Sequence, residues 1–207
     1  SHIAVAWLHI IPLKGAREYE NCQYLGNENN DHLVLVKAKT ADLELYPIHE
    51  SAKIIAEYAF ADCLNMQSVT FPESVISIGA RAFENCTKLK RVDISDLSAW
   101  CNIDFGNGYA NPLYYADGLY LGYTQITDLS IPQDVTQIKP LAFYGCSSLT
   151  SVTLPSSVTA VGASAFYGCE NLGGVYISDL AAWCNVEFPT RFSNPLYYAE
   201  TLSLNGT

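Results

Sequence analysis

Apolar and polar residues along this chain follow a pattern that returns every 23 residues. An Ala-Phe pair stands before a cysteine, with Phe60 three residues ahead of Cys63. Apolar residues then follow at Met66, Val69 and Phe71. The positions that recur in this way are Phe60, Cys63, Phe83, Cys86, Phe143, Cys146, Phe166 and Cys169. A fixed period in this range indicates a stacked repeat protein.

The repeat unit reads AFxxCxxLxxVxLPxxVxxIGxx, and its LxxVxLP part predicts a short β-strand. The apolar residues of that part alternate with polar ones, as they do in a half-buried strand. Pro72 and Pro155 follow directly and end the strand, because proline cannot donate to a sheet ladder. The AFxxC part predicts a turn or a short helical or 3₁₀ segment. Each coil thus contributes one strand to a parallel sheet, and only stacking buries its apolar side.

This unit resembles the BspA-type leucine-rich repeat, found in surface proteins of bacteria and some protozoa. Leu149, Val152 and Leu154 match the core of leucine-rich repeats in general, and the AFxxC signature resembles the BspA type specifically. At the usual Asn or Cys position the chain has Ser157, and Val158 comes one position early. The resemblance covers residues 43 to 177. It implies an α/β solenoid, a right-handed stack of coils with a parallel sheet on one face and short helical or 3₁₀ turns.

A longer duplication, with a period of 83 residues, overlies the short one. The segment SDLSAWCN at 95–102 returns as SDLAAWCN at 178–185, and NPLYYA at 111–116 returns at 194–199. Ser95 or Asp96 can cap a short helix through Trp100, and Asn111 with the next proline starts another. Residues 119–131 predict a strand, a turn at Gly122 and a strand that rejoins the repeat. Each insert is therefore a helix plus a hairpin.

Trp100 and Trp183 are the large aromatic residues of these two inserts. Each lies on a predicted helix that leads off the sheet, which favours a packing anchor over a ligand-stacking ring. Cys101 and Cys184 occur in matched contexts beside them, so we expect both thiols to be buried as small hydrophobes.

The repeats divide the chain into three parts. Residues 1–40 predict a hairpin or capping unit, with strands at 22–27 and 33–37 around an Asn-rich turn at 27–31. Residues 41–177 form the solenoid, with an insert at about 95–125, and residues 178–207 are a shortened copy of 95–124. Thr207 aligns with Thr124, before the strand that should follow, so we expect the native protein to continue.

Charge and hydropathy exclude several classes of protein. Acidic residues outnumber basic ones 21 to 11, which gives a net charge of −10 and disfavours nucleic acid and anionic membranes as partners. Hydrophobic residues make up 49% of the chain, too many for a disordered protein. The most apolar stretch, residues 3–13, is too short to span a membrane.

The sequence carries no sign of catalysis, a metal or a cofactor. The AFxxC cysteines are best explained as buried hydrophobes, and no cysteine and histidine spacing fits zinc. The Asn-rich segment 27–31 matches no calcium loop. Every distinctive motif occurs at least twice, whereas a catalytic site is normally built once from unlike residues. We therefore expect a protein that is not an enzyme.

The polar positions of the predicted strands form the candidate binding face. Stacked strands would bring them into a ladder with a spacing of about 4.8 Å. Its members are Ser68, Thr70, Arg91, Asp93, Asp128, Ser130, Ser151, Thr153 and Tyr176. Solenoids often bind through such a face, although a solvated surface explains any single residue equally well. The tyrosines after residue 100 are a second candidate for recognition.

Two functions from different classes remain open. One is a protein- or glycan-binding module of a bacterial cell-surface or secreted protein, and the resemblance implies adhesion to host or matrix components. The other is a spacer or scaffold that positions other domains of a longer surface protein. In either case the resemblance implies an extracellular or cell-surface location, and we expect a monomer.

Overall fold

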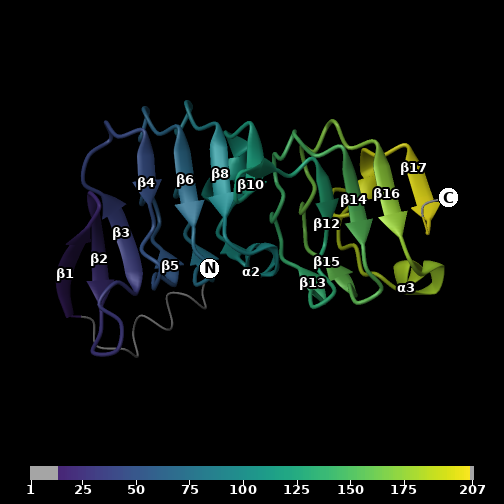
Figure 1. Cartoon of the computed structure of the whole chain (residues 1–207), viewed down its shortest axis with the longest axis horizontal. Coiled ribbons are helices and arrows are strands. Elements are labelled where there is room, and N and C mark those ends of the chain that lie inside the picture. Colours follow the sequence, from purple (N-terminus) through teal and green to yellow (C-terminus); the bar gives the residue numbers. More distant parts are fainter. Residues whose placement is uncertain (1–13, 206–207) are drawn as a thin grey trace.

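The computed structural model describes residues 14–205 as an elongated stack of coils (Figure 1). The strands lie side by side along the long axis, with β1 at one end and β17 at the other. The described chain is an α/β solenoid, which confirms the fold class expected from the repeat.

The LxxVxL segments form the main row of parallel strands. In this row, paired residues on neighbouring coils lie one 23-residue repeat apart in the sequence, so that Val69 pairs with Val92 and Val152 with Val175. The row is split into a sheet ordered β11-β10-β8-β6-β4 and another ordered β12-β14-β16-β17. The bounds of the first are β4 Leu45–Pro47, β6 Ser68–Phe71, β8 Arg91–Ile94, β10 Gly118–Leu121 and β11 Thr124–Gln125. Those of the second are β12 Asp128–Ser130, β14 Ser151–Leu154, β16 Gly174–Ile177 and β17 Thr201–Leu204.

A second row of short strands runs along the return path, where the sequence predicted no strand. Ile78 and Val161 of the xxIG segments lie in two-residue strands with buried side chains. The bounds are β5 Ile54–Ile55, β7 Ser77–Ile78, β9 Asp104–Phe105, β13 Gln137–Ile138 and β15 Ala160–Val161. Two residues give too little alternation to mark a strand, so only stacking on the neighbouring coils reveals it.

The AFxxC segments form turns rather than helices. The amide of Cys63 donates to the carbonyl oxygen of Phe60, and that of Cys86 does the same with Phe83, both at 3.1 Å. Left-handed residues stand two places before and two places after each phenylalanine: Tyr58, Asp62, Arg81, Asn85, Leu141, Gly145, Ser164 and Gly168. Because a right-handed helix cannot pass through such a residue, each turn stops after a few residues.

The inserts contain the helical elements of the described chain. Helix α2 (Leu97–Cys101) begins at Asp96, whose carboxylate accepts from the amide of Ala99, and α3 (Leu180–Cys184) begins in the same way at Asp179. This confirms the predicted cap. The 3₁₀ helices are η1 Gly108–Ala110, η2 Pro112–Tyr114 and η3 Pro195–Tyr197. Asn111 caps η2, as the Asn-Pro pair predicts, by accepting from the amide of Leu113 at 2.9 Å.

Three antiparallel strands cover the first coil, one more than the hairpin expected from the sequence. They are β1 Lys14–Tyr19, β2 Cys22–Gly26 and β3 Val34–Ala38, in the order β1-β2-β3. The Asn-rich segment forms the predicted turn, because the side chain of Asn27 accepts from the amides of Asn29 and Asn30. Strand β3 then pairs in parallel with β5 and joins this unit to the return-path row. Residues 1–13 lie outside the described chain.

Candidate functional site

The outward residues of the main strand row form two separate faces instead of one continuous ladder. Strand β10 pairs with β11, the returning arm of its own hairpin, and not with β12. The ladder predicted from the sequence is therefore divided into two parts, because the hairpin occupies the edge that β12 would need. We call the outward residues of β4, β6, β8 and β10 the first half-face, and those of β12, β14, β16 and β17 the second half-face.

The first half-face contains Ser68, Thr70, Arg91 and Asp93 of the predicted set. The register places Ser68 beside Arg91 and Thr70 beside Asp93. Next along the stack, Asp93 pairs with Tyr120.

Arg91 makes several contacts within the protein. Its Nε and Nη2 donate to the two carboxylate oxygens of Asp93 at 2.7 and 2.6 Å, and Nη2 also donates to the carbonyl oxygen of Gly122 at 2.8 Å. The guanidinium lies 4.1 Å from the centre of the Tyr120 ring. The hydrogen bonds that Arg91 donates to the Asp93 carboxylate raise the pKa of Arg91. This cluster fixes the β10–β11 hairpin to β8, so Arg91 and Asp93 serve the scaffold before any ligand.

The second half-face contains Asp128, Ser130, Ser151, Thr153 and Tyr176. Asp128 pairs with Ser151, and its carboxylate accepts from the Ser151 hydroxyl at 2.7 Å. Ser130, Thr153 and Tyr176 form one row, which Ser203 of β17 extends. No side chain of this row has a hydrogen-bond partner among residues 14–205.

Tyr176 stands out on the second half-face, with 39% of its surface exposed. Its neighbour in the strand, Gly174, leaves room for the ring, because a Cβ there would lie 3.3 Å from a Tyr176 ring carbon. Tyrosine offers apolar area with a polar tip, a combination enriched at recognition surfaces. The row of Ser130, Thr153, Tyr176 and Ser203 therefore presents free hydroxyl groups around one partly exposed ring.

The repeated Phe and Cys positions lie in the core. Their side chains are at most 2% exposed: Phe60, Cys63, Phe83, Cys86, Phe143, Cys146, Phe166 and Cys169. Phe60 stacks on Phe83 with 5.1 Å between ring centres. The thiols of Cys86 and Cys169 each donate to the carbonyl oxygen of a phenylalanine one coil earlier, at 3.2 and 3.3 Å. The cysteine therefore links successive turns as well as filling space.

The two tryptophans differ although their sequence contexts match. Trp100 is 1% exposed, and its indole donates to the carbonyl oxygen of Ala142 at 2.8 Å. Trp183 is half-buried and contacts Phe188, and within residues 14–205 no later coil covers it. For the same reason Cys184 is exposed, so the expectation of a buried thiol is wrong for Cys184 and right for Cys101.

The buried thiols are poorly suited to nucleophilic chemistry. Burial raises the pKa of Cys22, Cys86 and Cys101 to about 12, so they stay protonated near neutral pH. Among the described residues no group of three or more His, Cys, Asp or Glu side chains could hold a metal ion. In the same part of the chain, no helix has the length and apolar character needed to cross a bilayer.

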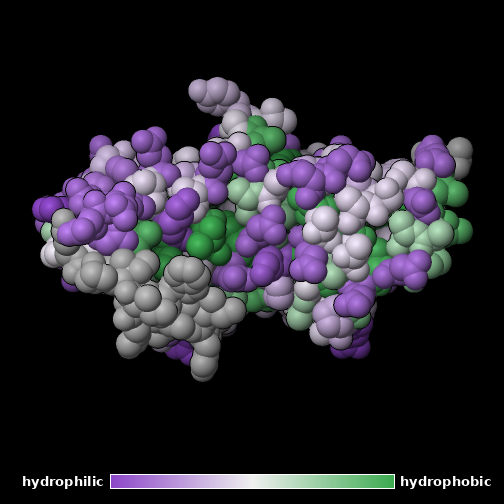
Figure 2. Space-filling view, turned by 90° about the horizontal axis from the view of Figure 1, so that it is seen from below, coloured by the Kyte–Doolittle hydropathy of each residue, from purple (hydrophilic) through white to green (hydrophobic). Residues whose placement is uncertain are grey.

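The space-filling view along one rim shows polar residues over most of the surface (Figure 2). Hydrophobic residues show in patches along the middle of this side and at the end that carries β17. That end exposes Leu180, Leu202 and Leu204 by 38–50%.

Sequence reasoning missed Tyr120 and Ser203 as members of the strand face. Both lie in strands of the inserts, where the 23-residue period is interrupted and only the 83-residue duplication relates them to each other. Aligning β10 and β17 with the other strands of the LxxVxL type would have found them.

Comparisons with known proteins agree with this geometry. The family model described as BspA type leucine rich repeat region matches in six copies, over residues 38–104 and 117–187. The chain is similar to a leucine rich cell surface protein from Faecalibacterium prausnitzii A2-165, with 26% identity and a TM-score of 0.52. That match covers 86% of this chain and 43% of the other, so this chain spans less than half of that protein's length.

A second solved structure is a leucine rich repeat protein from T. pallidum. It is 22% identical with a TM-score of 0.49, and the match covers 78% of this chain and 71% of the other. No curated protein matches the sequence.

Proposed function

Because this chain belongs to the BspA-type leucine-rich repeat family, we propose that it is a non-catalytic binding module of a bacterial cell-surface or secreted protein. It recognises a protein or a glycan, and adhesion to host or matrix components is the role that fits best. The similar F. prausnitzii protein is described as a cell surface protein, which supports the location.

The observation that carries this proposal is the free row on the second half-face. Ser130, Thr153, Tyr176 and Ser203 stand in register on adjacent strands. Their hydroxyl groups are not used within residues 14–205, whereas Arg91 and Asp93 of the first half-face are bound to each other. A rigid sheet holds the row in place, so little conformational entropy is lost when a partner binds.

The experiment is a binding screen of the purified chain on an array of matrix proteins and glycans. The proposal expects one class of partner to bind in a saturable manner. A variant with Tyr176→Ala and Thr153→Lys should lose most of that signal, since it removes the ring and adds a charge at the centre of the row. Unchanged binding by a folded variant would remove the second half-face from the proposal.

The alternative function is a spacer that positions other domains of a longer surface protein. The elongated stack in Figure 1 favours this function, because each coil adds length along a single axis. A chain that binds nothing on the array, and that separates two fused domains by a fixed distance, would support the spacer.

A further inference from the structure

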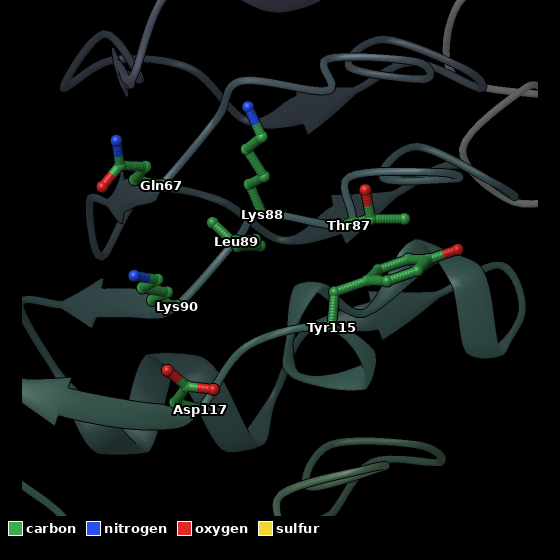
Figure 3. A pocket seen from close by; sticks show the side chains of 7 residues that line it. All are labelled: Gln67, Thr87, Lys88, Leu89, Lys90, Tyr115 and Asp117. Atoms are coloured by element: carbon green, nitrogen blue, oxygen red, sulfur yellow. The ribbon is translucent and has the colours of Figure 1, made fainter.

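A depression of about 340 Å³ lies at the rim of the first sheet, where β6, β8 and β10 begin (Figure 3). Its lining residues are Gln67, Thr87, Lys88, Leu89, Lys90, Tyr115 and Asp117. Figure 3 shows Lys88 and Lys90 extending from the stretch that leads into β8, and Tyr115 and Asp117 coming from the insert. The depression is separate from the second half-face, so a ligand site there can be tested independently of the function proposed above.

The two lysines are unusual in their setting. The chain has 11 basic residues against 21 acidic ones, yet Lys88, Lys90 and Arg91 fall within four positions. Lys88 donates to the side chain of Asn65 at 2.8 Å. Within residues 14–205 the Lys90 ammonium and the Asp117 carboxylate have no hydrogen-bond or ion-pair partner.

The internal duplication shows that the scaffold does not need these lysines. At the equivalent place 83 residues later the backbone is held in the same way. Tyr115 accepts from the amide of Asn85 at 3.0 Å, and Tyr198 accepts from that of Gly168 at 2.8 Å. The amide of Asp117 donates to the carbonyl oxygen of Lys90, and that of Glu200 donates to Gly173.

This second copy, which we call the twin site, carries different side chains on that shared frame. Leu172, Tyr198 and Glu200 match the leucine, the tyrosine and the acid of the depression. Glu170, Asn171 and Gly173 replace Thr87, Lys88 and Lys90. The same backbone frame therefore forms without the two lysines, so the fold does not require them.

We propose that the depression binds an acidic sugar, a single carboxylated ring at the end of or within a glycan. Lys88 and Lys90 supply the positive charge that attracts its carboxylate, and the Lys90 ammonium, which has no partner among residues 14–205, is the one free to bind it. The Tyr115 ring provides an apolar wall for the face of the sugar. Gln67 and Thr87 offer hydrogen bonds to its hydroxyl groups. The volume is at the lower end of the range for ligand pockets, which suits one ring rather than a longer segment.

Asp117 makes the depression select an acidic sugar over a simple anion. A carboxylate in the same depression repels inorganic phosphate or sulfate, but it accepts hydrogen bonds from the hydroxyl groups of a sugar. A ligand with one negative group and several hydroxyl donors uses both kinds of side chain. An acidic peptide satisfies the lysines and offers fewer donors to Asp117, so it is the competing ligand in the test.

The test is a titration followed by NMR, with methyl β-glucuronide as the probe and methyl β-glucoside as its neutral match. We expect the glucuronide to shift the amide signals of residues 87–90 and 115–117, and to bind at least tenfold more tightly than the glucoside. Equal binding of the two sugars overturns the role of the lysines. Equal or tighter binding of N-acetylglutamate methylamide overturns the sugar class in favour of a peptide.

The variant Lys88→Asn with Lys90→Gln tests the lysines with little risk to folding, because Asn65 and Gln67 occupy the same positions one coil earlier. It should lower the affinity for the glucuronide at least tenfold and leave binding at the second half-face unchanged. A folded variant with unaltered affinity contradicts the proposal.

The twin site provides the gain-of-function control. Glu170→Thr, Asn171→Lys and Gly173→Lys would copy the depression onto it, and a Cβ at Gly173 meets nothing closer than 3.8 Å. We expect this variant to bind two glucuronides per chain instead of one. One glucuronide per folded chain would show that the lysines are not what distinguishes the depression from its twin.

Discussion

The indole nitrogen of Trp100 donates a 2.8 Å hydrogen bond to the carbonyl oxygen of Ala142, which belongs to the AFxxC turn of a later coil. The side chain of Asn111 donates to the same oxygen at 3.1 Å. Both donors come from the first insert, and both bridge the gap between the two sheets of the main row. The first insert thus connects the two sheets of the main strand row through these hydrogen bonds.

Replacing Trp100 should therefore destabilise the protein far more than replacing Trp183. Trp100→Ala removes a fully buried ring, and we expect a loss of about 3–5 kcal/mol in the free energy of unfolding. Trp183→Ala removes a half-buried ring and should cost less than about half of that. Urea unfolding followed by circular dichroism measures both. Equal losses would mean that the two inserts have equivalent surroundings.

The seven cysteines should differ sharply in reactivity. Cys184 is exposed, whereas the other six are buried, and burial raises the pKa of Cys22, Cys86 and Cys101 to about 12. When the native protein is treated with a thiol reagent at pH 8, one thiol per chain should react rapidly, and Cys184→Ser should abolish this fast reaction. If several thiols per chain reacted rapidly in the folded variant, the packing of the coils would be contradicted.

Two glycines with left-handed backbones should respond differently to alanine. At Gly122 (φ 61°) a Cβ meets nothing within 4 Å, so Gly122→Ala should cost about 1 kcal/mol of conformational strain. At Gly145 (φ 81°) a Cβ would come within 2.8 Å of the Tyr114 Cα. Gly145→Ala should therefore cost clearly more, in the same urea measurement. Equal costs would show that the turn and the insert do not approach so closely.

The contact between the N-terminal cap and the first coil, made by His32 and His49, should lose stability in mild acid. The His49 ring stacks on His32 with 3.9 Å between ring centres, and burial followed by the nearby His32 lowers the pKa of His49 below 6.5. Glu50 opposes this shift, and the Ser51 hydroxyl lies 2.9 Å from Nδ1 of His49. Because the pKa of His49 is lower in the folded protein than in the unfolded chain, the neutral ring favours folding at a pH above the pKa of the unfolded chain. This contribution to stability is lost as the pH falls below about 6.5.

Thermal unfolding at pH 7.5 and pH 5.0 measures this effect. The wild type should unfold at a lower temperature at pH 5.0. His49→Gln should reduce the difference between the two pH values, because it removes the titrating ring. The same difference in the variant would assign the effect to other groups.

The repeat predicted the main strands because one apolar pattern recurs at Val69, Val92, Val152 and Val175, and each copy supports the others. The caps at Asp96 and Asn111 were also predictable, because the signal lies within a few residues. In each case local sequence and stacking favour the same structure.

The remaining features depend on what lies next to a residue in space. The β10–β11 hairpin, which turns at Gly122, prevents β10 from pairing with β12. The apolar pattern of the hairpin does not indicate which edge of the sheet its second strand will cover. Cys101 and Cys184 have the same local sequence and differ only in what covers them. The return-path strands at Ile78 and Val161 are too short to show alternation, so only contact with neighbouring coils forms them.

The central claim, that the second half-face binds the partner, is tested most directly by a matched pair of variants. Thr70 and Thr153 occupy the same position in the strands SVTF and SVTL, and both are exposed. Binding of Thr70→Lys and Thr153→Lys to the highest-scoring array partner is measured by surface plasmon resonance. The account predicts at least about a tenfold loss of affinity for Thr153→Lys, or about 1.4 kcal/mol, and little change for Thr70→Lys. A larger loss for Thr70→Lys, or no loss for either, would contradict it.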